Sequence, residues 1–509
     1  MIIRQGLGFS RGLPGAIGRS IIGAMEIRSV DITASGRIAL TAVVVFAAAT
    51  LAPGCYMFRS PDPAMGGIEE QITFDYKGHF LNSHQCFSPD DKWIVYDARI
   101  KPDAIGAVGV VEKVNVETGQ MLVVHRTAKQ TRHGPGAGAA AYNPTSNRVI
   151  FTGGPPNSGF LRPYGPRRRG GIIVDDSGPS KPIRADARDV THPFTPGALR
   201  GGTGGHQWSG DGKWICFVYH DAVMGKLEKI ERRRMDLRTV GVAAPIGPVK
   251  VDADSGGENA DGDMFAAVAA TVTAIPPRDS DEIQWAYSPS WVGTNGYVRP
   301  DGTRQKRAIA FKGVVRDDGW GRVAELYIVD LPERIDAPGP HGPLAGTVAS
   351  RPAAPKGCRQ RRLTRSTRRK YPGLQGPEHQ PRSSPDGKWI AYLAKDDRGA
   401  AQIHLISPNG GADRKLTSGA RPVESSFNWS PNGRYIAYVK DNSIFVTDTR
   451  PGDTFGKSVR LTKRTGDDRK PMPHAVVWSN RGDKIAFCRP IKYGGTAFPQ
   501  IFIVKLRRK

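Results

Sequence analysis

The chain has 509 residues, of which 39% are hydrophobic, and it contains 61 Gly and 40 Pro. So many turn-forming residues exclude a helical bundle and a disordered chain, and they favour an all-β fold cut by many turns. The 73 Lys and Arg against 48 Asp and Glu give a formal net charge of +25, which attracts polyanions in a salt-dependent way without identifying one.

The first predicted element is an export segment that spans residues 1–55. Within it, residues 38–51 (IALTAVVVFAAATL) are continuously apolar, and Arg28 and Arg37 precede them. This run is too short to span a membrane comfortably, but it has the length and the flanks of a signal peptide. We therefore expect the protein in the periplasm or on the cell surface.

Small residues after the apolar run lead to Cys55, as in the lipobox of bacterial lipoproteins. We expect Cys55 to be lipidated and to tether the protein to the membrane, although Ala52 stands where a lipobox usually has leucine. Ordinary cleavage nearby and an uncleaved anchor are the alternatives, and Met25 is an alternative start of the chain. Residues 56–69 follow as a linker.

A short motif recurs along residues 70–509, and its clearest copy is SPDGKWIAY at residues 384–392. Pro presets a turn torsion, Asp bonds to the local backbone, and Gly accepts the positive φ that reverses the chain. The apolar run that follows predicts a strand covered on both faces. Further copies begin at Ser88, Asn143, Ser209, Ser288, Ser430 and Ser479.

The copies that begin at Ser384 and Ser430 are each followed by a second apolar segment and then by a short basic one. After residues 384–392 these segments are residues 402–406 and residues 414–417. Together with the strand that leads into the turn, these segments make a unit of four strands, which is a propeller blade. The sequence therefore predicts an all-β propeller of seven four-stranded blades, with six as the alternative if the copy at Asn143 or Ser288 fails.

The two ends of this domain complement each other. The last unit ends with residues 500–504 and lacks a fourth strand, whereas residues 71–74 (QITF) resemble the fourth strands of other units, such as residues 460–462 (RLT). An open ring would expose two sheet edges. We therefore expect the N-terminal strand to pair in the last blade and close the ring.

The SPDGKWIAY repeat with a downstream RLT resembles the WD40-like repeats of TolB-type propellers. Four less regular segments, residues 194–214, 236–249, 281–291 and 371–374, resemble a bacterial family of uncharacterised TolB-like proteins. This resemblance covers nearly all of residues 70–505. It implies a propeller and brings no established activity.

The innermost strands of a propeller lead into the repeated turns, so the residues just before each turn should line the central channel. Several of them are His, Gln or Glu, namely His84, Gln85, His206, Gln207, His379, Gln380, Glu424 and His474. Imidazoles that converge on one axis bind a divalent metal or an acidic ligand. If the channel holds a metal, we expect His206, His379 and His474 to be its ligands.

The spacing of these histidines is uneven. His206 stands three residues before its turn serine and His379 five, but His84 stands four before, which points it to the other face of a regular strand. A polar channel lining without any ligand is the competing interpretation.

We expect a monomeric binding or scaffold protein for an envelope protein or an anionic polymer, with no catalytic residue and no cofactor assigned. A seven-bladed propeller with His and Gln in its channel resembles the oligogalacturonate lyases, which implies the alternative of a metal-dependent polyuronate lyase. Nucleic-acid binding ranks last, because an exported protein rarely meets nucleic acid.

Overall fold

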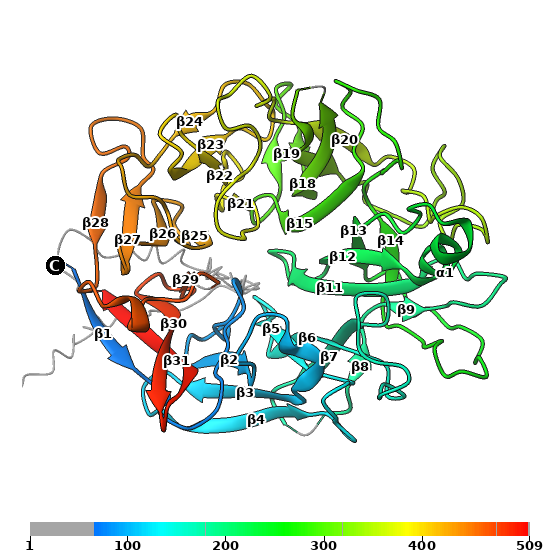
Figure 1. Cartoon of the computed structure of the whole chain (residues 1–509), viewed down its shortest axis with the longest axis horizontal. Helices are drawn as coiled ribbons and strands as arrows, with labels where there is room; N and C mark the ends of the chain where they lie inside the picture. Colours follow the sequence, from blue (N-terminus) through cyan, green and yellow to red (C-terminus); the bar gives the residue numbers. More distant parts are fainter. Residues whose placement is uncertain (1–65, 179, 318, 475, 507–509) are drawn as a thin grey trace, which may run out of the picture. The chain divides into compact units, whose positions relative to one another are not determined.

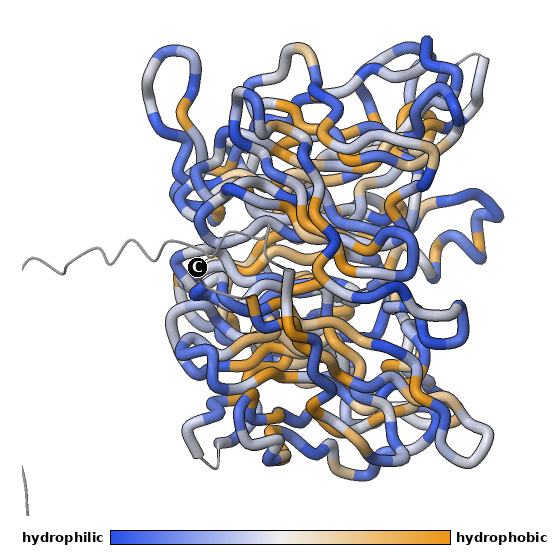
Figure 2. The backbone as a smooth tube through the Cα atoms, turned by 90° about the vertical axis from the view of Figure 1, so that its left-hand side faces the viewer, coloured by the Kyte–Doolittle hydropathy of each residue, from blue (hydrophilic) through white to orange (hydrophobic). Residues whose placement is uncertain are grey.

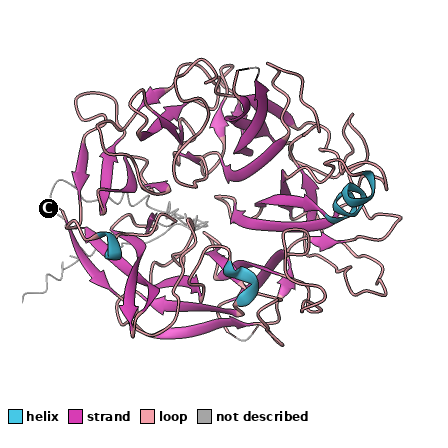
Figure 3. Cartoon of the chain, viewed as in Figure 1, coloured by secondary structure: helices cyan, strands magenta, loops and turns pink. Residues whose placement is uncertain are grey.

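The computed structural model describes residues 66–178, 180–317, 319–474 and 476–506. These residues form a ring of β-sheets around a central axis, with very little helix (Figures 1 and 3). The predicted export segment with Cys55 lies outside the described residues, as does most of the predicted linker.

Seven antiparallel sheets make up the ring, and we number these blades from the N-terminus (Figure 1). Blade 1 contains β2 (Trp93–Asp97), β3 (Val110–Asn115) and β4 (Met121–Arg126). Blade 2 contains β5 (Gly138–Tyr142), β6 (Arg148–Gly153), β7 (Gly170–Asp175) and β8 (Ile183–Arg184). Blade 3 contains β11 (Gly201–Trp208), β12 (Ile215–Asp221), β13 (Thr239–Ala244) and β14 (Phe265–Val268).

The remaining four blades follow the same order along the chain. Blade 4 contains β15 (Trp285–Trp291), β18 (Ala308–Asp317), β19 (Gly321–Asp330) and β20 (Arg359–Arg362). Blade 5 contains β21 (Arg382–Ser383), β22 (Ile390–Lys395), β23 (Ala401–Ile406) and β24 (Arg414–Lys415). Blade 6 contains β25 (Phe427–Trp429), β26 (Tyr435–Lys440), β27 (Ser443–Asp448) and β28 (Ser458–Arg460). Blade 7 contains β29 (Val476–Trp478), β30 (Lys484–Tyr493), β31 (Thr496–Leu506) and β1 (Gly67–Gln71).

The predicted all-β fold of seven blades is thereby confirmed. The innermost position of blade 1 is the least regular, because two isolated bridges take the place of a strand: Phe80 pairs with Asp97, and Phe87 pairs with Ile94. Between these bridges the chain bends at Ser83 and His84, and Gln85 has a positive φ of 50°.

The ring also carries smaller elements outside the seven blades. Two short sheets consist of β9 (Ala187–Arg188) with β10 (Ala198–Leu199), and of β16 (Tyr297–Val298) with β17 (Arg304–Gln305). Helix α1 (Ala222–Glu231) is inserted between β12 and β13, and two 3-10 turns are η2 (Ala104–Ala107) and η3 (Asp467–Arg469). In the part of the chain that the structure describes, no helix has the length and apolar character needed to cross a bilayer.

The repeated turns have the predicted chemistry. In blade 5, Ser384 Oγ donates to Asp386 Oδ1 at 2.6 Å and accepts the main-chain N–H of Trp389 at 3.1 Å, while Gly387 has φ of 74°. The serine thus links the start of the turn to the start of the next strand, which fixes the register of the hairpin.

The turn of blade 4 begins later than predicted. Ser288 lies inside β15 at a register shift, with φ of 55°, and the loop starts at Val292, whose amide bonds to Ala308 O at 2.9 Å. The loop that follows carries the β16–β17 hairpin. The prediction of a turn at Ser288 was wrong because this insertion replaces the usual turn residues, so that no complete motif marks the true start.

The N-terminal strand closes the ring. β1 runs antiparallel to β31 in blade 7, where Gly67 pairs with Leu506 and Gln71 with Phe502. The amide of Ile72 continues the ladder to Ile501 O at 2.9 Å. The closing strand therefore starts a few residues earlier than predicted, within the segment assigned to the linker.

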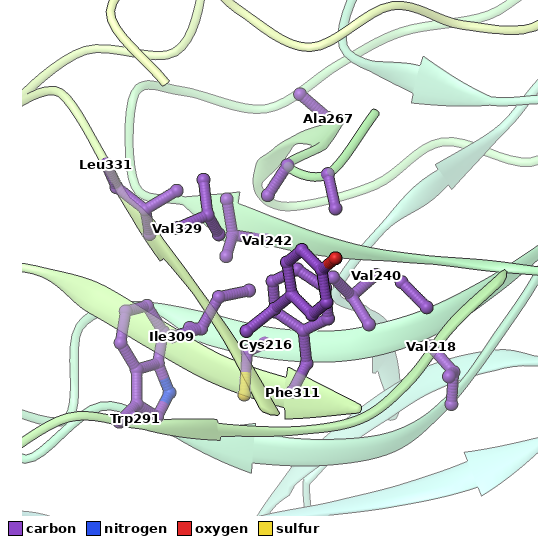
Figure 4. Close-up of a cluster of buried hydrophobic side chains, with 14 of the residues drawn as sticks. Cys216, Val218, Val240, Val242, Ala267, Trp291, Ile309, Phe311, Val329 and Leu331 are labelled. Atoms are coloured by element: carbon purple, nitrogen blue, oxygen red, sulfur yellow. The ribbon is translucent and has the colours of Figure 1, made fainter. Parts of the chain in front are cut away.

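The core is divided into clusters that lie between neighbouring blades. Figure 4 shows one of them, in which Cys216 and Val242 of blade 3 face Ile309 and Phe311 of blade 4. Figure 2 shows hydrophobic segments through the interior of the body and hydrophilic loops at its edges. Because both faces of each sheet pack on a neighbour, the strands read as continuous apolar runs rather than alternating ones.

Candidate functional site

The predicted channel residues His84 and Gln85 reach across the axis to blade 3. His84 Nε2 lies 3.0 Å from His206 O, and Gln85 donates from Nε2 to Trp208 O at 2.9 Å. The amide of Trp208 returns a hydrogen bond to Gln85 Oε1 at 3.1 Å. These contacts join two blades that are not neighbours in the ring.

Ser83 extends this crossing to the opposite side of the ring. Its carbonyl oxygen accepts from Asn428 Nδ2 of blade 6 at 2.8 Å and from Arg382 Nη2 of blade 5 at 3.1 Å. The inner segment of blade 1 is therefore pulled toward the axis instead of pairing as a strand. This position of the inner segment explains why the spacing between His84 and its turn serine differs from that of His206 and His379. The sequence shows the difference but not its cause.

The imidazoles of His206 and His379 have both ring nitrogens engaged. His206 Nδ1 is 3.1 Å from Thr152 Oγ1, and its Nε2 is 3.0 Å from Thr203 Oγ1. His379 Nδ1 donates to Pro377 O at 2.8 Å, and its Nε2 accepts the amide of Leu393 at 3.1 Å. Burial lowers the pKa of His206 to about 4 and the pKa of His379 well below its ordinary value, so both are neutral at pH 7.

The remaining candidate residues each lie in different surroundings. The His474 ring lies 5.4 Å from the ring of Phe80, and Glu424 accepts the amide of Asp441 at 3.1 Å at the β26–β27 turn. Gln380 has a buried Oε1 with no hydrogen-bond partner in the described structure. Gln207 lies with His84 and Gln85 on the wall of a cavity at the axis.

These residues do not fit a channel metal. Over residues 66–506, apart from the three positions that the structure leaves undescribed, no group of three His, Cys, Asp or Glu side chains could hold a metal ion. The hydrogen bonds of His206 and His379 would have to break before either imidazole could act as a ligand.

A large cleft lies on the face of the ring opposite the repeated turns. It has a volume of about 1010 Å³ and is built where the connections between second and third strands of blades 2, 3 and 4 meet. Because the strands are antiparallel, these connections lie at the opposite strand ends from the repeated turns. Its lining is rich in cations and aromatic rings, including Arg167, Arg168, Lys229, Arg234, Arg238, Arg322, Tyr164, Trp285 and Tyr287.

Glycines in β11 let one wall of the cleft approach closely. A side chain at Gly202 would collide with the main chain of Pro166, and a Cβ at Gly204 would lie 2.7 Å from Arg169 Nε. The connection between β6 and β7 can therefore lie directly on β11, which brings Arg167 and Arg168 to the cleft.

Three arginines of the cleft stack on aromatic rings. The guanidinium carbons of Arg234 and Arg322 lie 4.9 Å and 5.0 Å from the ring centre of Trp285, and that of Arg238 lies 5.2 Å from the ring centre of Tyr287. Within the described residues none of these arginines forms an ion pair with a carboxylate, and Glu378 acts on Arg238 through its charge without pairing with it. Stacking covers the flat face of a guanidinium and leaves the N–H groups on its edge available to a ligand.

A buried lysine lies behind Tyr287. Lys312 is 5% exposed, its Nζ lies 3.3 Å from His379 Nδ1, and it lies 5.8 Å from the Tyr287 ring centre. The pKa of Lys312 is lowered to about 8, chiefly by burial, while the charge of Glu378 opposes this shift and the charge of Arg238 adds to it. At this end of the cleft the positive charges of Lys312 and Arg238 therefore exceed the negative charge of Glu378.

Carboxylates fix the rim of the cleft. Asp236 accepts from Arg167 Nε at 2.6 Å and lies 3.3 Å from His220 Nδ1, while Glu258 pairs with Arg168 at 2.7 Å. These pairs hold two arginines in place, in contrast to the three stacked arginines, which are left for a ligand.

The cleft was not predicted from the sequence. Its residues come from connections that carry no repeat, and the basic runs 167–169 and 232–234 have no motif that distinguishes them from solvated surface charge. The available signal was that two irregular segments, 236–249 and 281–291, contribute Arg238, Trp285 and Tyr287 to the cleft, and that the basic run 232–234 lies next to the first of them.

Comparisons with known proteins agree with this fold. Residues 136–258 match a family described as "Protein of unknown function (DUF3748)". Among solved structures, the chain resembles an oligogalacturonate lyase from Vibrio parahaemolyticus, with a TM-score of 0.50 and 13% identity over 86% of this chain and 93% of that one. TolB from Acinetobacter baumannii gives a TM-score of 0.32 and 15% identity over 84% of this chain and 85% of that one. At 13% identity the likeness to the lyase concerns the fold alone.

A relative of much higher identity is the "Uncharacterized protein YidR" of Escherichia coli (strain K12). The two sequences are 37% identical over 424 residues, which is 82% of this chain and 94% of YidR. The chain therefore belongs to the same family as YidR, and its own fold is a seven-bladed β-propeller.

Proposed function

We propose that this propeller is a binding protein of the cell envelope and that its cleft holds an anionic polymer. The observation that supports this most is the stacking of Arg234, Arg322 and Arg238 on Trp285 and Tyr287 without carboxylate partners. The rings hold each guanidinium in place, so little side-chain freedom is lost when a ligand binds.

The dimensions and chemistry of the cleft suit a chain rather than a single small molecule. A volume of about 1010 Å³ is at the upper end of the range of small-molecule sites. Guanidinium edges bind carboxylate or phosphate groups through two parallel hydrogen bonds. The net charge of +25 would increase the rate at which a polyanion is captured at low salt.

The proposed location is the periplasm or the cell surface, with a tether at Cys55. It is supported by the apolar run at residues 38–51 and by the small residues that lead to the cysteine. A monomer that is anchored in this way would hold an envelope polymer, or an acidic segment of an envelope protein, close to the membrane. An exported protein would rarely meet nucleic acid.

A binding titration tests the proposal. Polygalacturonate serves as a carboxylate polymer and polyphosphate as a phosphate polymer, and binding is followed by Trp fluorescence at low and at high salt. We expect saturable binding that weakens with salt, and a loss of about tenfold or more in affinity for Arg234→Gln combined with Arg322→Gln.

Arg359→Gln is the matched control, because Arg359 is exposed on β20 of blade 4 and lies outside the cleft. The control removes one positive charge and should bind like the wild type. Equal losses in the control and in the cleft variants would mean that net charge alone attracts the polymer, which would contradict the proposal.

The alternative is a metal-dependent polyuronate lyase. The cleft could also hold uronate carboxylates, and the likeness to an oligogalacturonate lyase concerns the fold. The engaged ring nitrogens of His206 and His379 weigh against a channel metal. Polygalacturonate that binds without being cleaved supports the binding protein, and the appearance of unsaturated products would favour the lyase.

A further inference from the structure

A second cavity lies at the axis, at the ends of the inner strands that lead into the repeated turns. It has a volume of about 300 Å³, and residues from six of the seven blades line it. Its polar lining includes Gln85, Gln207, Ser290, Arg382, Asn428 and Asn480. It is separate from the cleft of the proposed function and shares no lining residue with it.

Arg382 provides the charge of this cavity. It is the only Arg, Lys, Asp or Glu in the described lining, and it is 6% exposed. The other titratable group is His84, and burial together with the nearby Arg382 lowers the pKa of His84 to about 3, so His84 is neutral at pH 7. The cavity therefore carries a single positive charge.

No carboxylate compensates this charge among the described residues. The hydrogen bonds of Arg382 all run from Nη2, to Ser83 O and Ser83 Oγ at 3.1 Å and to His84 Nδ1 at 3.3 Å. Burial lowers the pKa of Arg382 to about 10, which reflects the cost of a guanidinium without a counter-charge.

Other deeply buried arginines of this protein have carboxylate partners. Arg200 pairs with Asp221 at 2.6 Å, and Arg489 pairs with Glu69 at 2.9 Å. The fold thus compensates buried guanidinium groups elsewhere, and Arg382 differs from them in facing a cavity. A missing counter-charge beside an empty space indicates a ligand that supplies the charge.

We propose that the axial cavity binds a small anion against the guanidinium of Arg382. Nε and Nη1 of Arg382 make no hydrogen bond to the described residues, so their N–H groups are available to chloride, phosphate or a short carboxylate. The volume leaves room for such an anion together with several waters, since a water occupies about 30 Å³. The neutral amides of Gln207 and Asn428 complete a polar wall.

Thermal unfolding at constant ionic strength tests this site. Sodium chloride, acetate and phosphate are each titrated, and gluconate, the bulkiest of the four anions, keeps the ionic strength constant. We expect a saturable rise in Tm of about 2 °C or more for at least one small anion, because a ligand that binds only the folded state stabilises it. The anion that gives the rise distinguishes an inorganic ligand from a small organic acid.

Arg382→Met and Arg382→Lys make the test specific. The rise should disappear in Arg382→Met and persist in part in Arg382→Lys, which keeps the charge. General salt effects on the folded state act on all three proteins alike. A rise of equal size in the wild type and in Arg382→Met, or no rise in the wild type, would overturn the proposal.

A second measurement covers the case in which Arg382→Met does not fold. Crystals of the wild-type protein are grown in sodium bromide, and the anomalous signal of bromine is mapped. We expect a peak within hydrogen-bonding distance of the Arg382 guanidinium. Bromide peaks confined to the protein surface would refute the site.

Discussion

Trp291 of blade 4 donates its indole N–H to the main-chain carbonyl of Gln207 in blade 3, at 3.0 Å. Trp429 bonds in the same way to Arg382 O at 2.8 Å, and Trp478 bonds to Asn428 O at 3.1 Å. Each tryptophan ends the innermost strand of its blade, and each acceptor lies near the corresponding end in the preceding blade. The repeat therefore specifies a hydrogen bond between blades as well as a turn within one.

Replacing Trp291 by Phe tests this bond. The phenyl ring keeps most of the packing but leaves Gln207 O without its donor, and a buried group that loses its partner costs about 1–3 kcal/mol. We expect the free energy of unfolding, measured with urea, to fall by that amount.

Trp208→Phe is the matched control in blade 3. The indole N–H of Trp208 is buried and has no hydrogen-bond partner in the described structure, so its removal should cost less than the removal of the Trp291 donor. Equal losses for Trp208→Phe and Trp291→Phe would show that packing, and not the hydrogen bond, stabilises the ring.

Closure of the ring gives a second prediction. Arg489 of β30 bonds to Glu69 of β1 through Nε at 2.9 Å and Nη2 at 3.1 Å. Glu69→Gln would leave the buried guanidinium without its counter-charge, and we expect a loss of about 2–3 kcal/mol in the free energy of unfolding. Glu70→Gln removes a solvent-exposed pair with Lys505 from the same strand and should cost less than about 1 kcal/mol. Similar losses for both variants would contradict the role given to Arg489.

The fold was largely predictable because its signals are local. The serine, aspartate and glycine of each turn act within a few residues, as Ser384 and Asp386 do, so every complete copy marks its own hairpin. Closure followed from counting strands. Where the local signal failed, at Ser288, an insertion had displaced the turn.

The candidate site was not predictable for the opposite reason. Its residues meet through contacts that are distant in sequence, such as Pro166 lying on Gly202, and no periodic pattern reports them. The channel histidines were found by spacing, but spacing does not show that His84 bonds to His206 O, or that Thr152 and Thr203 occupy the ring nitrogens of His206.

The buried side chain of Lys312 predicts that the free energy of unfolding depends on pH. Burial lowers its pKa from 10.5 to about 8 in the folded protein. Between these values the unfolded chain binds more protons, so this group makes the free energy of unfolding rise with pH, by up to about 3 kcal/mol between pH 8 and pH 10.5.

The comparison of the wild type with Lys312→Met isolates this contribution, because the titration of other groups cancels. We expect the stability advantage of Lys312→Met to be largest below pH 8 and to shrink as the pH rises to 10.5. Parallel pH profiles of the two proteins would show that Lys312 titrates normally.

The channel histidines give a prediction about metals. Because the ring nitrogens of His206 and His379 are engaged in hydrogen bonds, protein purified without chelators should contain no stoichiometric manganese, zinc or calcium. Elemental analysis checks this. Stoichiometric metal in the wild type that is lost in His206→Ala and His379→Ala would favour the lyase instead.

The most direct test of the central claim is hydrogen–deuterium exchange with and without a bound anionic polymer. We predict that the polymer slows exchange in the segments that form the cleft, residues 163–168, 228–238 and 285–287, and leaves the repeated turns on the opposite face unchanged. Protection confined to those turns, or none in the cleft at a saturating concentration of polymer, would contradict the account.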